Sequence, residues 1–425
     1  MRRVVVHNIA LLSITIAIIL ILGEIALRVI SHTNEDDNTL IRGKMLKPYN
    51  FPLHISRKSM DFYLNNVDKK PSKVQYVYDK FLGWNSNPNM TDTYNEQGIL
   101  GPNKLFTVKP EDDILRIALF GDSMTRSSGR GFDKSWGYLL EKNLIELGYN
   151  VEVMNFGVGG YGIDQIYLRW EIEGKKYSPH IVIFGFYSVD IARCLEVHKL
   201  KNWGLTGGIL FSKPRFLIES NNDTLKTINY PTIPPDKLLY NTKSFDDLPY
   251  IQYDTIYTED KDDYKKYFWR KSYLLRFIEA NLANNRFTQT SYNKDSQYYD
   301  TEKEGAQLAL KIVELFQHSV QEKNASFFTM IIPGMIDLLH LKDSKPLRYV
   351  NLIDMIEKFS PVIHAEKKMK DYEDIKEFYI PNDGHFSSLG NEIIAQILSE
   401  YLAENFNQLR DRKMGVSAQP IPSRF

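Results

Sequence analysis

The most regular feature of this sequence is a repeat in which a short apolar run ends in a loop and a helical period follows. Fully apolar strands that alternate with amphipathic helices indicate a parallel sheet covered on both faces. We therefore expect one α/β domain over residues 114–406. The apolar runs are Leu115–Phe120, Val151–Phe156, Ile181–Phe186 and Phe327–Ile332, and the helical segments lie around Trp136–Leu147, Ile163–Glu173, Glu302–Lys323 and Leu389–Phe406.

The segments that follow the apolar runs are predicted to meet at one rim of the sheet, because ligands of such sheets bind beyond the carboxyl ends of the strands. These segments are Ser123, Gly157–Gly162, Ser188–Asp190 and Pro333–Gly334. The alternation lapses over residues 200–300, which are rich in Tyr, Asn, Asp and Lys. We interpret this stretch as an insertion that shapes the rim of a pocket, with a hairpin over Ile218–Ile228 and a helix over Trp269–Leu282.

Residues 1–31 form a predicted membrane anchor, which begins with Arg2 and Arg3 and continues as a long apolar stretch. The stretch has the roughly 20 residues that a helix needs to cross a bilayer. A spanning anchor is favoured over a cleaved signal peptide, because no small-residue cleavage site follows the apolar core. The two arginines before the stretch and the acidic Glu35–Asp37 after it place the N-terminus in the cytoplasm. The body is then expected outside, in the periplasm or at the cell surface.

Two further segments flank the predicted domain. Residues 32–113 are polar, aromatic and rich in proline, without a long helical period, which predicts a stalk and irregular strands that pack over the edge of the domain. Residues 407–425 are polar and contain two prolines, which predicts a frayed tail.

Composition narrows the possible functions. The 53 basic and 53 acidic residues give a formal net charge of zero, so no global field draws the protein onto nucleic acid. Cys194 is the only cysteine, which excludes an intrachain disulfide and any Cys/His zinc pattern. We expect neither a metal ion nor a cofactor.

The candidate chemistry lies in Gly121-Asp122-Ser123, directly after the first apolar run. A serine hydroxyl is a weak nucleophile at neutral pH, so it needs a base within reach and a group that orients that base. Among the nine histidines, His385 has a suitable neighbour, since Asp383 can accept a hydrogen bond from Nδ1 and leave Nε2 free for Ser123. A triad is favoured over the alternative in which His385 only starts a helix and Asp383 only forms a turn.

These motifs resemble those of the SGNH, or GDSL-type, serine hydrolase superfamily, in a membrane-anchored branch with one residue between Asp and His. Three blocks carry the resemblance: Gly121–Ser123, Asn155–Gly160 and Asp383–His385. It implies a flavodoxin-like three-layer sandwich with a central parallel sheet. It also implies that Ser123 is the nucleophile, that the backbone N–H groups of Ser123 and Gly160 stabilise the oxyanion, and that Asp122 lies beside them.

One block departs from the family pattern. Within Tyr187–Asp190 the family has an Asn whose side chain completes the oxyanion hole, and this chain has Val189. Loss of one such donor typically costs about 100- to 1000-fold in turnover. Three interpretations stay open: Ser188 or another group substitutes, turnover is slow, or the oxyanion geometry differs.

The resemblance implies a membrane-tethered serine esterase or O-acyltransferase, and the sequence does not decide whether water or a sugar hydroxyl receives the acyl group. The expected substrate is an acyl ester, above all an acetylated envelope or secreted polysaccharide, and a transferase would use a membrane partner that supplies the acyl group. The alternative, motivated by Val189, is a weakly active or inactive module that binds glycan or scaffolds an envelope complex.

The run Gly157–Gly162 also fits the G-x-G-x-x-G fingerprint of dinucleotide-binding proteins. That interpretation is disfavoured, because the run follows the second strand and the next strand ends without a ribose-binding acid.

Overall fold

Five parallel strands form the central sheet of the computed structural model, which describes residues 2–50, 53–127, 131–199, 208–219, 224–282, 297–381 and 383–413. The strands are β6 (Leu115–Phe120), β7 (Val151–Asn155), β8 (Ile181–Phe186), β11 (Ser326–Ile331) and β12 (Val362–Ile363). Their order, β12-β11-β8-β6-β7, is the flavodoxin-like order 2-1-3-4-5 when these five strands alone are numbered along the chain. The predicted α/β sandwich with a parallel sheet is therefore confirmed, and β12 is an edge strand that the apolar pattern did not predict.

Strand β6 lies between β7 and β8, where the order of the strands reverses. Leu119 is in register with Asn155 of β7 on one side and with Ile183 of β8 on the other. Successive β6 residues serve opposite faces, since Ala118 and Phe120 belong to one buried cluster and Ile117 and Leu119 to the other. The residues that follow β6 are thus held by a strand that is buried on both faces.

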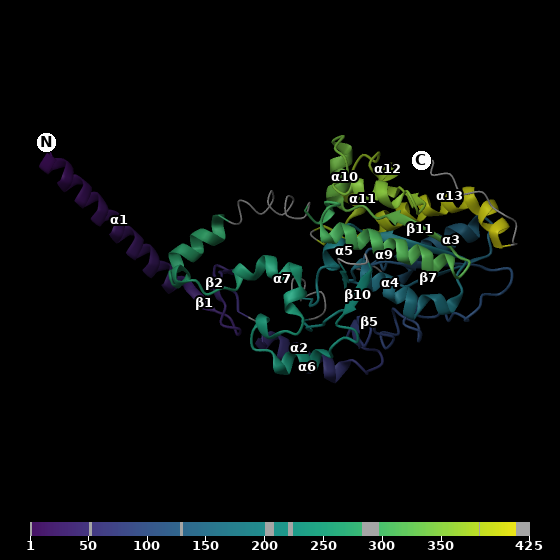
Figure 1. Cartoon of the computed structure of the whole chain (residues 1–425), viewed down its shortest axis with the longest axis horizontal. Helices are drawn as coiled ribbons and strands as arrows, with labels where there is room; N and C mark the ends of the chain where they lie inside the picture. Colours follow the sequence, from purple (N-terminus) through teal and green to yellow (C-terminus); the bar gives the residue numbers. More distant parts are fainter. Residues whose placement is uncertain are drawn as a thin grey trace.

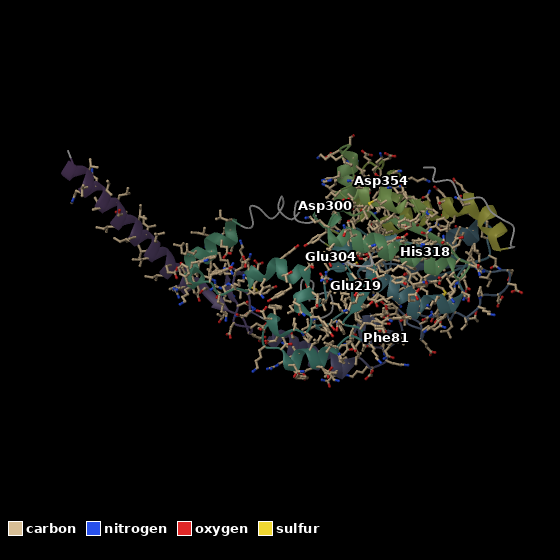
Figure 2. All side chains as sticks on the ribbon, in the orientation of Figure 1. Phe81, Glu219, Asp300, Glu304, His318 and Asp354 are labelled. Carbon is tan, nitrogen blue, oxygen red and sulfur yellow. The ribbon has the colours of Figure 1, made fainter. Side chains whose placement is uncertain are left out.

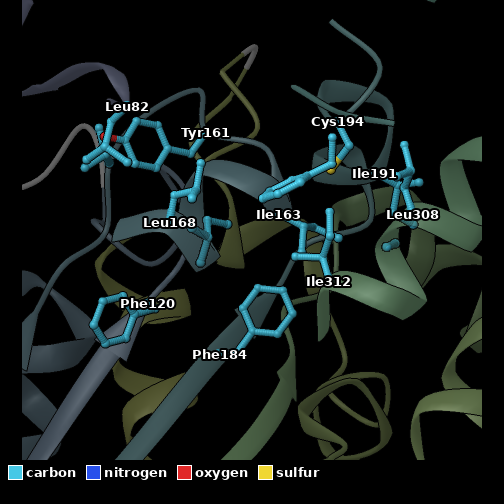
Figure 3. Packing of buried hydrophobic residues seen from close by; sticks show 14 of the residues in the cluster. Leu82, Phe120, Tyr161, Ile163, Leu168, Phe184, Ile191, Cys194, Leu308 and Ile312 are labelled. Atoms are coloured by element: carbon cyan, nitrogen blue, oxygen red, sulfur yellow. The ribbon is translucent and has the colours of Figure 1, made fainter. Parts of the chain in front are cut away.

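Helices cover both faces of the sheet, which makes the three layers. On one face lie α3 (Trp136–Glu146) and α13 (Ser388–Lys413), and on the other lie α4 (Ile163–Ile172) and α9 (Glu304–Gln321). Phe120 stacks on Phe156 with a centroid distance of 4.7 Å and meets the edges of Trp170 and Phe316. Figure 3 shows Phe120 and Phe184 beneath Ile163, Leu168 and Ile312.

The segment before the domain is more regular than the sequence predicts. It contains a small antiparallel sheet of β1 (Ser31–Thr33), β2 (Thr39–Ile41) and β3 (Lys44–Met45), and a hairpin of β4 (Tyr76–Asp79) and β5 (Gly83–Ser86). It also contains the 14-residue helix α2 (Leu53–Asn66), so the expectation of no long helix was wrong. The helical period was hidden because one of the buried positions, Ser56, is polar, while Met60 and Tyr63 complete the buried stripe.

The insertion contains the predicted hairpin, formed by β9 (Arg215–Ile218) and β10 (Leu225–Ile228), whose tip at residues 220–223 lies outside the described residues. The predicted helix Trp269–Leu282 is interrupted at Ser272, with a 3-10 turn over Phe268–Lys271 before it and a helix over residues 273–282 after it. The remaining helices are α5 (Val189–Arg193), α6 (Pro235–Asn241), α7 (Thr255–Asp260), α10 (Met335–Lys342), α11 (Val350–Ile356) and α12 (Ala365–Met369).

The first helix, α1 (Arg2–Ile30), projects from the body (Figure 1). Its Val5–Ile30 segment has a mean hydropathy of 2.6, none of its most apolar window is buried, and it is long and apolar enough to cross a membrane. Figure 2 shows its side chains without protein neighbours along most of its length. At the other end of the chain, α13 continues to Lys413, so the tail expected from residue 407 is helical over its first seven residues.

Candidate active site

Ser123 lies just beyond the carboxyl end of β6, in a turn that requires a glycine. A Cβ on Gly121 would stand 1.9 Å from Thr125 Oγ1, so no larger residue fits before Asp122 and Ser123. The Ser123 hydroxyl donates to Asp122 Oδ2 at 3.2 Å, and the Met124 N–H donates to Asp122 Oδ1 at 2.8 Å. Ser123 is 9% exposed, and the hydrogen bond of its hydroxyl to Asp122 is buried.

The glycine-rich loop after β7 runs directly beside Ser123. Asn155 ties the two loops together, since its Oδ1 accepts from the Gly157 N–H at 2.9 Å and its Nδ2 donates to the Thr125 carbonyl at 2.8 Å. A Cβ on Gly159 would stand 3.7 Å from the Ser123 Cβ, and Gly160 has a φ of +80°. The predicted neighbourhood of Ser123 and the glycine loop is therefore present.

A hairpin from the segment before the domain supports this loop. Trp84 Nε1 donates to the Gly159 carbonyl at 3.1 Å, and the Tyr161 hydroxyl donates to the Trp84 carbonyl at 2.6 Å. The Tyr76 hydroxyl leaves no room for a side chain at Gly159, where a Cβ would stand 2.1 Å from it.

A buried charge cluster lies behind the nucleophile, centred on Arg193 of α5. Arg193 Nη1 donates to Asp122 Oδ2 at 2.7 Å, to Asp190 Oδ1 at 2.5 Å and to the Tyr161 carbonyl at 3.2 Å. Burial, together with the charge of Asp122, raises the pKa of Asp190 well above its usual range. Sequence reasoning missed Arg193, although its spacing of three residues from Asp190 in a short helix was a signal.

A second buried cation lies beside the glycine loop. Lys199 is fully buried, its Nζ donates to Glu196 Oε2 at 3.0 Å, and its Cε would stand 3.5 Å from a Cβ on Gly160. Burial lowers the pKa of Lys199 from its usual value, although Glu196 opposes the effect. Nothing in the local sequence distinguishes this lysine from a solvated one.

Asp383 and His385 form the predicted pair. Asp383 Oδ1 is hydrogen-bonded to His385 Nδ1 and also accepts from the His385 N–H at 3.1 Å, while Asn382 lies outside the described residues. The turn is tied to the sheet through the Tyr379 hydroxyl, which donates to the Pro333 carbonyl at 2.8 Å just after β11. Among the described residues His385 Nε2 has no hydrogen-bond partner, and Ser123 bonds to Asp122 instead of to His385.

The third predicted segment of the rim opens α5. Ser188 is buried, and its hydroxyl makes no hydrogen bond within the described part of the chain, so its role beside the oxyanion stays a prediction. Val189 is 36% exposed and presents apolar surface where the family has an amide. On the far side, a Cβ on Gly334 would stand 3.6 Å from the Tyr187 ring, so Pro333–Gly334 joins the same rim.

Metal ligands and cavities were also sought outside this rim. Within the described residues, no three His, Cys, Asp or Glu side chains are grouped so that they could hold a metal ion. A groove of about 450 Å³ between α3 and α13 is lined by Leu139, Leu147, Glu392 and neighbouring residues, and it contains none of the site residues.

This chain is similar to several proteins of known structure. No family model and no curated protein matches the chain. The chain is similar to an acetyl xylan esterase, with 14% identity, a TM-score of 0.36 and coverage of 68% of this chain and 99% of that one. It is also similar to a putative GDSL-like lipase from Parabacteroides merdae, with 13% identity, a TM-score of 0.36 and coverage of 70% and 99%.

A lipase/acylhydrolase from Enterococcus faecalis overlaps at 13% identity and a TM-score of 0.34, covering 68% of this chain and 96% of that one. All three are structures of lipases or esterases. At such identities and TM-scores the overlaps assign no role to any residue of this chain, and the site rests on the chain's own geometry.

Proposed function

We propose that this protein is a membrane-tethered serine esterase or O-acyltransferase that acts on acyl esters, acetylated polysaccharide foremost. The observation that carries the proposal is the position of Ser123, at the carboxyl end of β6, where the strand order reverses and the Gly159 backbone lies alongside. Ligands of open α/β sheets bind at this point. A carbonyl bound there would meet a hydroxyl together with the backbone N–H groups of Ser123 and Gly160.

In the proposed reaction the Ser123 hydroxyl turns from Asp122 towards His385 and attacks the acyl carbonyl. Loss of its hydrogen bond to a charged acceptor costs about 1.5–3 kcal/mol. His385 Nε2 takes the serine proton and returns it to the oxygen of the leaving alcohol, while Asp383 holds Nδ1–H and stabilises the imidazolium. The acyl-enzyme then passes its acyl group to water or to a sugar hydroxyl, with His385 again as the base.

Arg193 offers a replacement for the amide that Val189 lacks. Its guanidinium bonds to Asp122, which precedes Ser123, and to the carbonyl of Tyr161, which follows Gly160. A buried cation beside Asp122 and the glycine loop stabilises negative charge that develops on the substrate oxygen, because the site is shielded from water. Val189 then adds apolar surface for a short acyl chain.

A fluorophosphonate probe tests the nucleophile on the full-length protein in detergent. We expect stoichiometric labelling of the native protein, no labelling of Ser123→Ala and slow labelling of His385→Ala. Ser326→Ala is a matched control, because Ser326 lies at the opposite end of the sheet, at the start of β11, and it should label normally. A Ser123→Ala protein that still labels at the native rate would refute the assignment.

Two further experiments address the finer parts of the proposal. Incubation with an isotopically labelled acetyl ester and candidate glycans distinguishes free acetate, the product of an esterase, from acetylated glycan, the product of a transferase. A reporter fused after Phe425 tests the topology, because the proposed orientation requires activity outside the cytoplasm and none within it.

The second candidate is a binding module that does not turn over substrate, and two observations favour it. The Ser123 hydroxyl is hydrogen-bonded to Asp122 and the chain has Val189 in place of the amide, so the resting site is not assembled for attack. If the folded protein is never labelled by the probe, and the Ser123→Ala variant keeps its cellular role, the esterase proposal is refuted and only the binding module stands.

A further inference from the structure

The helix over residues 273–282 has its apolar side chains on the outside. Leu275, Ile278 and Leu282, spaced by three and four residues, are 45%, 43% and 57% exposed and therefore form one apolar stripe that faces away from the body. Phe268, in the preceding 3-10 turn, is 83% exposed. A helix on the surface of a water-soluble domain normally turns such a stripe towards the core.

Two charged side chains hold this helix in place, Arg276 on the face opposite the stripe and Glu279 at the edge of the stripe. Arg276 donates to the carbonyls of Leu46 and Lys47 and to Thr39 Oγ1, so it is anchored on the small β1–β3 sheet. Glu279 forms an ion pair of 2.7 Å with Arg270, which is also buried. Because these bonds fix the rotation of the helix, the apolar stripe cannot roll inwards.

The helix is joined to the end of α1. Glu24 of α1 accepts hydrogen bonds from the Ser272 hydroxyl and the Leu274 N–H, both at 2.8 Å, and from the Tyr273 N–H at 3.0 Å. Gly23 lies against Leu274, since a Cβ on it would stand 3.7 Å from the leucine Cδ1. Figure 1 shows this teal-green helix at the foot of α1, away from the α/β body.

The level of this junction along α1 matches a membrane boundary. A helix crosses the hydrocarbon core in about 20 residues, so a span that begins near Val4 ends near Gly23 and Glu24. Arg28, beyond that point, donates to the Lys271 carbonyl at 2.9 Å and lies 4.5 Å from the centre of the Tyr273 ring. Tyrosine and arginine are the residue types that gather at the bilayer interface.

We propose that helix 273–282 lies in the bilayer interface beside the end of α1 and inserts Leu275, Ile278 and Leu282 among the lipids. The inference rests on the proposed membrane tether, because it takes α1 as the spanning helix. A helix that turns its polar side chains towards the protein and its apolar side chains outwards is suited to a position where lipid surrounds its outer face. Attachment at two points then holds the body in one orientation to the membrane, which a single spanning helix on a flexible stalk would not do.

The proposal can be tested by site-directed fluorescence in vesicles of phosphatidylcholine. An environment-sensitive maleimide is attached to Leu275→Cys or Ile278→Cys in the full-length protein, where the native Cys194 is buried. We expect emission shifted to the blue and loss of intensity with lipids that carry a doxyl quencher near the headgroup. Tyr240→Cys on α6, at a side chain that is 62% exposed, is the water-facing control and should show neither effect.

A label at Ile19→Cys in α1 separates failure of this proposal from failure of the tether. Quenching at position 19 by a doxyl group in the acyl chain, without quenching at 275 or 278, would overturn the interfacial helix and leave the tether intact. Absence of quenching at all three positions would overturn the tether itself. Efficient disulfide cross-linking of two Leu275→Cys chains would show that the apolar stripe packs against a second copy of this chain, and it would contradict insertion into lipid.

Discussion

The rim of the sheet and helix 273–282 both bury an arginine, but with different partners. At the rim, Arg193 bonds to the carboxylates of Asp122 and Asp190. Beside α1, Arg276 bonds to neutral oxygens, those of Leu46, Lys47 and Thr39. The first arginine is therefore part of a charge balance, and the second is a clamp between two chain segments.

This difference predicts different consequences for the two regions. A buried charge with charged partners creates a local field, and its removal leaves uncompensated charge. A buried charge with carbonyl partners adds hydrogen bonds and fixes geometry, and its removal leaves acceptors without donors. The rim is thus suited to stabilising charge in a reaction, whereas the clamp is suited to turning a helix so that its apolar face points outwards.

The largest effect is expected for Arg193→Met. Two buried carboxylates then lose their shared cation, which costs about 3–5 kcal/mol of stability, and ester hydrolysis should fall by about 100-fold or more. Chemical denaturation and kcat on a soluble acetyl ester measure the two effects. The double variant Arg193→Met, Asp190→Asn should regain stability without regaining activity. Recovery of full activity in the double variant would show that Arg193 only balances the charge of the carboxylates.

The next effect concerns Asp254, which joins the segment after α5 to α7. Its carboxylate accepts the N–H groups of Val197 and His198, after α5, and that of Tyr257 in α7. Burial raises the pKa of Asp254 from 3.8 to about 6. The Asp254 carboxyl group thus binds its proton more tightly in the folded protein than in the unfolded chain. Its contribution to the free energy of unfolding is present below about pH 4 and is lost as the pH rises through 6.

In Asp254→Asn this pH-dependent contribution disappears. Relative to the native protein, the unfolding free energy of the variant should therefore rise by about 2.4 kcal/mol between pH 4 and pH 7. His198, whose pKa burial lowers to about 4, titrates in both proteins and cancels in the difference. Denaturation curves at the two pH values give the result, and a constant difference would contradict the raised pKa.

A smaller effect is expected for Arg276→Met, which removes the clamp and leaves the rim unchanged. Loss of its hydrogen bonds should cost about 1–3 kcal/mol, and amide hydrogen exchange should speed up in residues 39–46 and in helix 273–282. Hydrolysis of a soluble ester should stay close to the native rate. A loss of activity as large as that of Arg193→Met would show that the two regions are not separable.

The smallest effect is expected for Val189→Asn, which adds a side-chain donor at the rim. If Arg193 compensates only partly for the missing amide, kcat/KM on a small acetyl ester should rise by about 10-fold, which is below the 100- to 1000-fold value of a full donor. An isosteric control, Val189→Thr, should give a smaller change. If kcat/KM does not rise in Val189→Asn, another group already supplies the hydrogen bond to the oxyanion that the asparagine would donate.

Much of the fold could be predicted because the sheet is buried on both faces. Strands such as Leu115–Phe120 and Ile181–Phe186 are continuous apolar runs, and their boundaries agree with the structure. The short β12 and helix α2 could not be predicted, since two residues carry no period and Ser56 interrupts the stripe of α2. The break at Ser272 depends on Glu24, a residue 248 positions away, which caps the helix that follows.

By itself, the sequence determined the α/β alternation, the apolar first helix, and the local motifs in which Ser123 follows a strand and Asp383 precedes His385 by two residues. These features are encoded by neighbours in the chain, through periods of 2 and 3.6 and through short turns. Only the tertiary structure decided that Arg193 stands behind the nucleophile, that Trp84 and Tyr76 support the glycine loop, and that helix 273–282 turns its apolar face outwards. Those outcomes depend on burial and on contacts between distant segments, which local patterns do not encode.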